Sequence, residues 1–444
     1  MGKILFAVTP LAGHVNPLLP VAEHLKNEGH AIWFATSNAF KEQIERRKME
    51  FLPLLDNANY DHRRIGEIVP ELRTATSPNE QANWYIKRVF GDRIVAQFAS
   101  LQYYVRKHAI DIIIVDVLYM GVLPLLLKTE PRPRIISCGV IAPYWQDPAF
   151  SVFHGPDDTP GGHIRNIQDA RRFNEMRQPG HSHIDAVLGS LDVAVSGGYK
   201  STVLYELPDV FLQFGVEAFE YPMANRLRNL HFVGPILPRR DHPAVPPDGR
   251  LFIADDGKPV VFVTQGTLAN YDFEQLINPA IRGLAEEDVH VVVSAGGNRE
   301  GQAISSPNAA IHPYIAYEDI LPRAQVFVTN GGYNGVQQAL SFGVPIVAAG
   351  VSEDKPLVNQ RVAWTGTGID LKTGSPSPEQ IRSAVREILS KPTYSERARS
   401  LGAEIAKTDA LKSITKIVRT VLARRWPGPE YNRYAPTQIK QILG

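Results

Sequence analysis

The sequence predicts an α/β protein with two tandem, doubly wound parallel-sheet domains. Along most of the chain, apolar runs typical of buried strands alternate with segments of helical periodicity, and this alternation indicates parallel sheets. A proline-rich stretch at residues 234–249 interrupts it. The chain has 444 residues, and single hydrophobic cores seldom grow beyond about 250 to 300 residues. Two domains joined at the proline-rich stretch are therefore expected.

The predicted elements of the first half follow one another in strand-helix order. Residues 3–9 (KILFAVT) are a continuous apolar run that predicts a buried strand, and residues 17–29 have apolar side chains at helical spacing. Asn16 and Pro17 suit the cap and the first turn of that helix, which places His14 in the loop before it. Further strands are expected at residues 30–36, 51–55 and 111–116, with helices at 38–48 and 80–108.

Residues 147–183 depart from this alternation because Gly, Pro and His accumulate there, and they predict a mobile loop region over a site. After the proline-rich stretch the alternation restarts, with strands expected at 260–264, 289–294, 325–329 and 345–349. The predicted organisation is a first domain at residues 1–233, a linker at 234–249, a second domain at 250–423 and a last segment, 424–444, that packs back on the first domain.

Composition and charge favour a small-molecule partner. The 47 basic and 46 acidic residues give a net charge of +1, which provides no electrostatic reason to expect nucleic acid or an anionic membrane surface. No apolar stretch approaches the roughly 20 residues of a membrane span. The first residues lead directly into a strand-helix unit, so we expect no signal peptide and a cytoplasmic protein. The single cysteine, Cys138, excludes an internal disulfide and is expected to be buried.

A histidine follows the first predicted strand. In an open parallel sheet, ligands bind in the crevice at the carboxyl ends of the strands, because loops and helix N-termini converge there. His14, in the stretch TPLAGHVNP, occupies such a position. It is either a functional residue of that crevice or a loop or capping residue.

The strongest motif lies at residues 326–345 (VFVTNGGYNGVQQALSFGVP), an apolar strand, a Gly-Gly turn and a helix. Glycines let a ligand approach the backbone closely, and the N–H groups at a helix N-terminus attract phosphate oxygens. The motif predicts a diphosphate site in the second domain, and the alternative is a plain tight turn. Neither the dinucleotide fingerprint G-x-G-x-x-G at this turn nor a P-loop anywhere in the chain is present.

Three motifs in order resemble those of the family 1 nucleotide-sugar glycosyltransferases, which include plant and macrolide glycosyltransferases. Residues 326–345 are similar to their donor-sugar signature, residues 13–17 (GHVNP) to their N-terminal histidine motif, and residues 265–267 (QGT) to the turn that opens their second domain. The resemblance spans most of the chain. It implies a GT-B fold, two Rossmann-like domains facing across a cleft. It also implies inverting transfer of a sugar from a nucleoside diphosphate sugar (UDP- or dTDP-linked, UDP-glucose favoured) to a hydroxyl of a hydrophobic small molecule.

The resemblance implies that His14 is the base that deprotonates the acceptor hydroxyl. Its second ring nitrogen needs a carboxylate partner, and Asp116 is expected at the same sheet edge because it ends the strand at 111–116. Asp111 begins that strand and is expected at the opposite edge. Helix capping is the alternative role for Asp116.

Several donor positions depart from the family pattern. Asn330 stands in place of the usual diphosphate-binding His, Gly335 in place of a Ser or Thr, and Gln338 in place of a ribose-binding Glu, although amides still form hydrogen bonds. Tyr314 is expected to stack on the base, and Asp354 and Lys355 to replace an acidic-Gln pair that binds sugar hydroxyls. Both Tyr314 and Tyr317 are alternatively core residues. The other donor-binding residues implied are Gly13, Gly266, Thr267, Tyr317, Gly331, Gly332, Asn334 and Val336.

Aromatic residues of the first domain are candidates for an apolar acceptor pocket or, alternatively, for its core. No cofactor and no metal are expected beyond the nucleotide-sugar co-substrate, because the sequence has no Asp-x-Asp motif and no metal-spaced ligand cluster. A nucleotide-sugar epimerase and a non-catalytic nucleotide-sugar binder are the alternative functions, the latter favoured if His14 and Asp116 lie far apart. The candidate acceptor residues are Trp84, Tyr85, Phe90, Tyr119, Tyr144 and Trp145.

Overall fold

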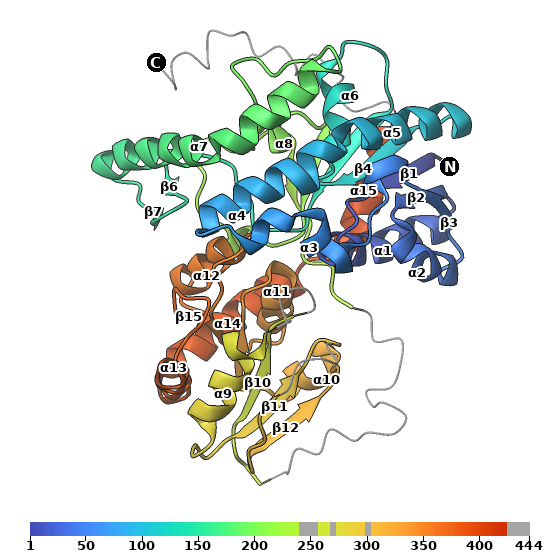
Figure 1. Cartoon of the computed structure of the whole chain (residues 1–444). Coiled ribbons are helices and arrows are strands. Elements are labelled where there is room, and N and C mark those ends of the chain that lie inside the picture. Colours follow the sequence, from blue (N-terminus) through green and yellow to red (C-terminus); the bar gives the residue numbers. More distant parts are fainter. Residues whose placement is uncertain (239–255, 267–271, 298–302, 424–444) are drawn as a thin grey trace.

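The computed structural model describes residues 1–238, 256–266, 272–297 and 303–423, which form two α/β domains (Figure 1). In the first domain the strands are β1 (Lys3–Ala7), β2 (Ala31–Thr36), β3 (Glu50–Pro53), β4 (Ile112–Asp116), β5 (Arg134–Gly139), β8 (Val210–Gln213) and β9 (Leu230–Phe232), and β6 (Phe150–Ser151) and β7 (Gly155–Pro156) form a separate hairpin. Its helices are α1 (Ala12–Asn27), α2 (Lys41–Arg46), α3 (Ile65–Ile68), α4 (Pro78–Tyr85), α5 (Ile94–His108), α6 (Leu123–Leu127), α7 (Pro160–Gly189) and α8 (Val203–Glu206).

The second domain contains β10 (Val260–Thr264), β11 (His290–Ser294), β12 (Ala309–His312), β13 (Val326–Thr329), β14 (Ile346–Ala348) and β15 (Gly368–Asp370). The helices of this part of the chain are α9 (Ile277–Leu284), α10 (Tyr317–Ile320), α11 (Tyr333–Ser341), α12 (Lys355–Trp364), α13 (Pro378–Ser390), α14 (Pro392–Ala406) and α15 (Ala410–Leu422).

Both sheets are parallel. The first has the order β3-β2-β1-β4-β5-β8-β9 and the second the order β12-β11-β10-β13-β14-β15. Strand β4 shows why the strands are continuously apolar: Ile112 and Ile114 enter the core on one face of the sheet, and Ile113 and Val115 enter the core on the other. The predicted fold class is confirmed.

Helix α1 begins at Ala12 rather than at Pro17, so the predicted helix start was wrong. His14 lies in the first turn of this helix and not in a loop. The backbone N–H groups of His14 and Val15 both donate to the Leu11 carbonyl, at 2.9 Å, and these bonds start the helix ahead of the proline. Pro17 and Pro20 each lack the N–H that would bond four residues back, and the helix nevertheless continues through both to Asn27.

The prediction of a mobile loop within residues 147–183 was also wrong, because α7 covers most of that segment. A side chain from another helix, Asn83 of α4, accommodates Pro179 and Gly180 within α7. Asn83 Oδ1 accepts from the Gly180 N–H (3.0 Å), and Asn83 Nδ2 donates to the Met176 carbonyl (2.8 Å). The Asn83 amide therefore replaces the helical bond between residues 176 and 180 and keeps α7 continuous past Pro179.

Helix α15 packs on the first domain, although the predicted boundary at residue 423 placed it in the second, and the boundary is corrected on this point. Ile414, Val418 and Val421 join the core that contains the buried face of α1, and Arg419 Nη2 lies 2.6 Å from Glu28 Oε2. The chain therefore reaches the first domain before residue 424, and the predicted return of residues 424–444 stays a prediction. Residues 424–444 and most of the proposed linker, 239–249, lie outside the described residues.

One hydrophobic core spans the two domains. It joins Val216 and Phe219 of the first domain to Tyr333 and Val358 of the second. Figure 1 shows α11 and α12 on the side of the second domain that faces the first. Within the described ranges, no helix combines the length and apolarity needed to cross a membrane.

Candidate active site

His14 and Asp116 form a buried pair at the carboxyl edge of the first sheet. They follow the adjacent parallel strands β1 and β4, and His14 Nδ1 lies 2.7 Å from Asp116 Oδ1. The Asp116 carboxylate also accepts the Thr9 N–H at Oδ2 (2.6 Å) and the Leu118 N–H at Oδ1 (3.0 Å). Because an ionised carboxylate only accepts hydrogen bonds, Nδ1 carries the proton and Nε2 presents its lone pair.

The surroundings of this pair fit a base that meets a ligand. A Cβ added to Gly13 would meet nothing within 4 Å, so there is open space beside His14. Asp111 lies at the other end of β4, where its Oδ2 accepts the Lys3 N–H (2.8 Å). The predicted placement of the two aspartates at opposite edges of the sheet is confirmed.

Residues 330–336, here called the donor turn, comprise the connection from β13 to α11 and the first turn of α11. Gly332 is the N-cap of α11 and no side chain caps the helix. The first N–H groups of a helix, here those of Tyr333, Asn334 and Gly335, have no acceptor within the helix. A Cβ on Gly332 would meet nothing within 4 Å, whereas one on Gly331 (φ +91°) would lie 1.8 Å from Asn359 Oδ1. The turn is closely packed beneath and open above, which suits an anion.

The donor turn meets the turn after β10. Asn330 Nδ2 donates to the Gln265 carbonyl at 2.5 Å, and Gly266 (φ +75°) faces Asn330 Oδ1. The Gln265 side chain is occupied in holding the start of α9, since its Oε1 accepts the Ile277 N–H (3.0 Å). Two motifs distant in sequence are thus brought together, while Thr267 lies outside the described residues.

Two of the predicted tyrosines differ in their surroundings. Tyr314 is 63% exposed, which leaves it available to stack on a base. The Tyr317 ring packs edge-on against Phe262 and Phe327 and lies under Gly335. Burial raises the pKa of Tyr317, whose hydroxyl bonds to Thr264. Tyr317 is partly buried and supports the donor turn from the core side; its direct contact with the donor stays a prediction.

The helix that starts at the donor turn exposes its residues unequally. Asn334 is partly exposed, Gln338 is 9% exposed and Val336 is fully buried. Asn334 and Gln338 share one face of α11, since they are four residues apart. The Val336 side chain is not available to a ligand, and its backbone N–H already donates to the Gly332 carbonyl (3.0 Å).

The predicted sugar-binding residues lie against the first domain. Asp354 Oδ2 accepts the Ala142 N–H (2.9 Å), and Tyr144 Oη donates to the Glu353 carbonyl (3.3 Å). Burial raises the pKa of the Asp354 carboxyl. Lys355 is buried, and its ammonium is paired with Glu353. Asp354 thus reaches the edge of the sheet that carries His14, whereas the charge of Lys355 is already balanced.

The aromatic candidates for the acceptor pocket divide into two groups. Trp84, Tyr85 and Phe90 are partly buried in a cluster with Leu11, the residue before α1. Tyr144 lies at the contact between the domains, as described above. Tyr119 and Trp145 are only 1% and 4% exposed and belong to the cores beneath the sheet. The surroundings of these two residues fit the alternative of a core role.

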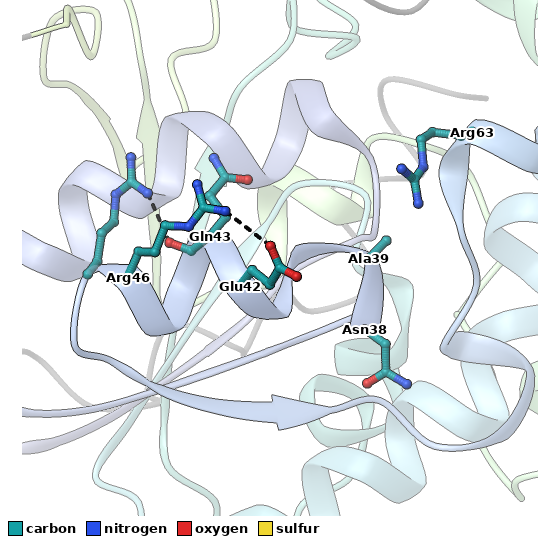
Figure 2. A pocket seen from close by; sticks show the side chains of 7 residues that line it. Asn38, Ala39, Glu42, Gln43, Arg46 and Arg63 are labelled. Carbon is teal, nitrogen blue, oxygen red and sulfur yellow. Dashed lines mark hydrogen bonds and ion pairs between the residues drawn. The ribbon is translucent and has the colours of Figure 1, made fainter.

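A polar surface pocket lined by residues of α2, by Asn38 and Ala39 before it and by Arg63 is not part of this site (Figure 2). Its arginines have partners already: Arg46 with Glu42 at 3.1 Å, Arg47 with the Gln43 carbonyl at 3.0 Å, and Arg63 with Asp61 at 2.6 Å. Among the described residues there is also no group of three or more His, Cys, Asp or Glu side chains arranged to hold a metal.

Comparisons with known proteins agree with this geometry. The model of the glycosyltransferase family 28 N-terminal domain matches residues 4–110, and that of the erythromycin biosynthesis protein CIII-like C-terminal domain matches residues 280–421. UDP-glycosyltransferase 2 of Phaeomoniella chlamydospora is 31% identical over 433 residues, covering 93% of this chain and 94% of the relative. The chain belongs to the family 1 glycosyltransferases.

Further relatives of this glycosyltransferase include the 4'-demethylrebeccamycin synthase of Lentzea aerocolonigenes, 31% identical over 426 residues that cover 94% of this chain and 98% of the relative. Among solved structures, the calicheamicin glycosyltransferase CalG4 superposes with a TM-score of 0.72 at 20% identity, covering 96% of this chain and all of that chain. At that identity the likeness shows the fold alone, which is GT-B.

Sequence reasoning missed several residues that shape the site of this glycosyltransferase. Asn359 packs beneath Gly331, and Gly350 is required because a Cβ there would lie 2.2 Å from the Asn330 carbonyl oxygen. Tyr60, at the centre of the cluster with Trp84, carries no periodic signal. These contacts arise from packing between distant segments, which no local pattern encodes.

Proposed function

We propose that this glycosyltransferase transfers a sugar, with inversion, from a nucleoside diphosphate sugar to a hydroxyl of a hydrophobic small molecule. The observation that carries the proposal is the 2.7 Å contact between His14 and Asp116 at the sheet edge that Asp354 also reaches. A non-catalytic binder would not need this pair, and an epimerase would not need a base in the acceptor domain. UDP-glucose is the favoured donor, since relatives bear names such as UDP-glucosyltransferase B1 of Starmerella bombicola.

In the proposed reaction His14 Nε2 takes the proton of the acceptor hydroxyl while its oxygen attacks the anomeric carbon. A new C–O bond forms, the bond from that carbon to the diphosphate breaks, and the electron pair leaves with the diphosphate. Asp116 stabilises the imidazolium that forms. General bases of this kind contribute about 10² to 10⁴ in rate. A single displacement of this kind inverts the anomeric carbon.

The leaving diphosphate would be held by the donor turn. The N–H groups at the start of α11 and the dipole of that helix oppose the charge that develops on the diphosphate. Asn330 lies beside them, with its Nδ2 engaged by the Gln265 carbonyl. Because backbone donors supply this stabilisation, the proposed reaction requires no divalent ion.

The test combines a substrate panel with one variant. The protein is incubated with nucleotide sugars and with flavonoid, phenolic, macrolide and sterol acceptors; products are identified by mass and their anomeric configuration by NMR. We expect His14→Ala to lower transfer at least about 10²-fold with diphosphate affinity nearly unchanged, because the donor turn lies in the other domain.

A matched control is available in His163→Ala, which removes another His–Asp pair, His163 Nε2 to Asp158 Oδ1 at 2.6 Å, on the surface helix α7. This control is expected to transfer normally. Normal transfer to a neutral alcohol by His14→Ala, or a loss of diphosphate affinity as large as the loss of rate, would refute the assignment of the base.

A further inference from the structure

The donor turn is tied to the first domain by a side chain of its own. Tyr333, the first residue of α11, donates its hydroxyl hydrogen to Glu220 Oε1 (2.9 Å) and accepts from Gln213 Nε2 (2.9 Å). Gln213 ends β8, and Glu220 follows a short helical turn at Glu217–Phe219, so both partners belong to the first domain. All three side chains are buried. The contact between the domains at this point is therefore buried and polar.

The Glu220 carboxylate binds two helices of the second domain at once. Its Oε1 accepts from Tyr333 on α11, and its Oε2 accepts from Arg361 Nε on α12 at 2.6 Å. The Arg361 guanidinium is 1% exposed and lies 4.4 Å above the Tyr221 ring. The buried charge of Glu220 is thus balanced by Arg361, and the hydroxyl of Tyr333 completes its hydrogen bonding.

The first domain is shaped for the close approach of this tyrosine. A Cβ on Gly215 would lie 2.5 Å from Tyr333 Oη, and one on Gly139 would lie 2.2 Å from Gln213 Oε1. One turn further along α11, Gln337 Nε2 donates to the Phe214 carbonyl (2.6 Å). Helix α11 is consequently fixed against the end of β8 at two successive turns.

The anchor lies on the same sheet edge as the catalytic pair. Asp116 pairs with Cys138 of β5, and the next residue of β5, Gly139, pairs with Gln213 of β8. Two strand spacings, roughly 10 Å, therefore separate the Tyr333 anchor from Asp116. The backbone of Tyr333 belongs to the donor turn, and its side chain is fixed to the sheet that carries His14.

We propose that Tyr333 is a positioning residue for glycosyl transfer, which sets the placement of the bound diphosphate relative to His14. This inference rests on the function proposed above. A misplacement of about 1 Å between reacting groups lowers rates on the order of 10²-fold. The loss of the hydroxyl should therefore act on turnover and leave donor affinity intact.

The variant Tyr333→Phe keeps the ring and removes only the hydroxyl. We expect kcat to fall about tenfold or more, within the range of such misplacements, while the Kd for UDP, measured by calorimetry, changes less than about twofold. The calorimetric stoichiometry gives the fraction of folded protein, so kcat is corrected for any loss of fold. The matched control is Tyr394→Phe, which removes an equal 2.9 Å bond, from Tyr394 Oη to Glu387 Oε1, within the second domain. Its kcat should be unchanged.

A second variant removes a partner of the Tyr333 hydroxyl that lies in the first domain. Gln213→Leu removes the other partner of the Tyr333 hydroxyl without touching the donor turn, and it should give the same fall in kcat at constant UDP affinity. If Tyr333→Phe does not fold, the kcat of Gln213→Leu tests the inference in its place.

The inference is overturned if folded Tyr333→Phe, or folded Gln213→Leu in its place, keeps wild-type kcat. It is equally overturned if the affinity for UDP falls as far as kcat, because the hydroxyl would then act in donor binding. Failure of the proposed function is distinguishable, since the wild-type protein itself would then form no product with any donor and acceptor.

Discussion

Replacing Asp116 with asparagine tests the geometry of the proposed catalytic pair, His14 and Asp116. The carboxylate has three donors around it: the Thr9 N–H on Oδ2, and the Leu118 N–H and His14 Nδ1 on Oδ1. An amide offers one oxygen and one NH₂ group in place of the two carboxylate oxygens. Whichever way it is oriented, its NH₂ group faces at least one backbone N–H.

The orientation of that amide decides the tautomer of His14. With its oxygen toward Thr9, the amide keeps the shortest of the three bonds (2.6 Å) and its NH₂ donates to Nδ1 of His14. The proton of the imidazole then moves to Nε2, and the base loses its lone pair. With the oxygen on the other side, the buried Thr9 N–H faces an NH₂ group. Each orientation leaves one backbone N–H unpaired. The first is expected because it keeps the bond to the buried Thr9 N–H and leaves unpaired the Leu118 N–H, which is less deeply buried.

The two consequences have different sizes. One buried, unpaired N–H costs about 1 to 3 kcal/mol of stability, whereas a base held in the wrong tautomer loses about 10² to 10⁴ in rate. Asp116→Asn should therefore fold, with a moderately lower unfolding temperature, and transfer poorly to neutral alcohols. The assay is kcat with a neutral alcohol, beside thermal unfolding and UDP calorimetry. A folded variant that retains kcat within about threefold would refute the tautomer argument.

Three further outcomes are expected. Gly332→Leu places a side chain in the open space above the donor turn and should weaken UDP binding at least about tenfold, as a lost charge-assisted hydrogen bond would; equal affinity in calorimetry would contradict the site. Turnover should continue in a chelator, and complete loss restored by Mg²⁺ or Mn²⁺ would show that a metal is required. Burial lowers the pKa of His181 to about 4. The unfolded chain, with an ordinary histidine pKa near 6.5, therefore binds a proton first as pH falls, and stability should decrease between about pH 6.5 and 4 by up to about 3 kcal/mol. When the free energy of unfolding is measured with denaturant at about pH 6.5 and pH 4, the decrease should be smaller in His181→Gln than in the wild type. An equal decrease in both proteins would contradict this prediction.

The sequence predicted those parts of the fold that depend on neighbouring residues. The apolar run of β4 is continuous because its side chains alternate between two buried faces. This pattern can be recognised from a short stretch of neighbouring residues. The pairing of His14 with Asp116 was also predictable, because parallel strands end at the same edge.

The incorrect predictions concern contacts between distant residues. Helix α7 depends on Asn83, which replaces a backbone bond within it, and no property of residues 147–183 alone reveals that partner. The buried pair of Glu220 and Arg361 is separated by 141 positions and belongs to no motif. The sequence around Tyr119 does not distinguish a buried aromatic residue from an exposed one. Only the packing of the folded chain places its ring in the core.

The return of α15 to the first domain means that the chain passes between the domains twice, near Gly234 and again at Thr408. These crossings touch: a Cβ on Gly234 (φ +92°) would lie 2.1 Å from Thr408 Oγ1. In topological terms the second domain is an insertion whose two covalent connections to the first domain lie side by side, at Gly234 and Thr408. Cutting the chain in the linker would consequently yield no complete domain, because the first fragment would lack the helix that closes its core and the second would carry that helix with nothing to cover it.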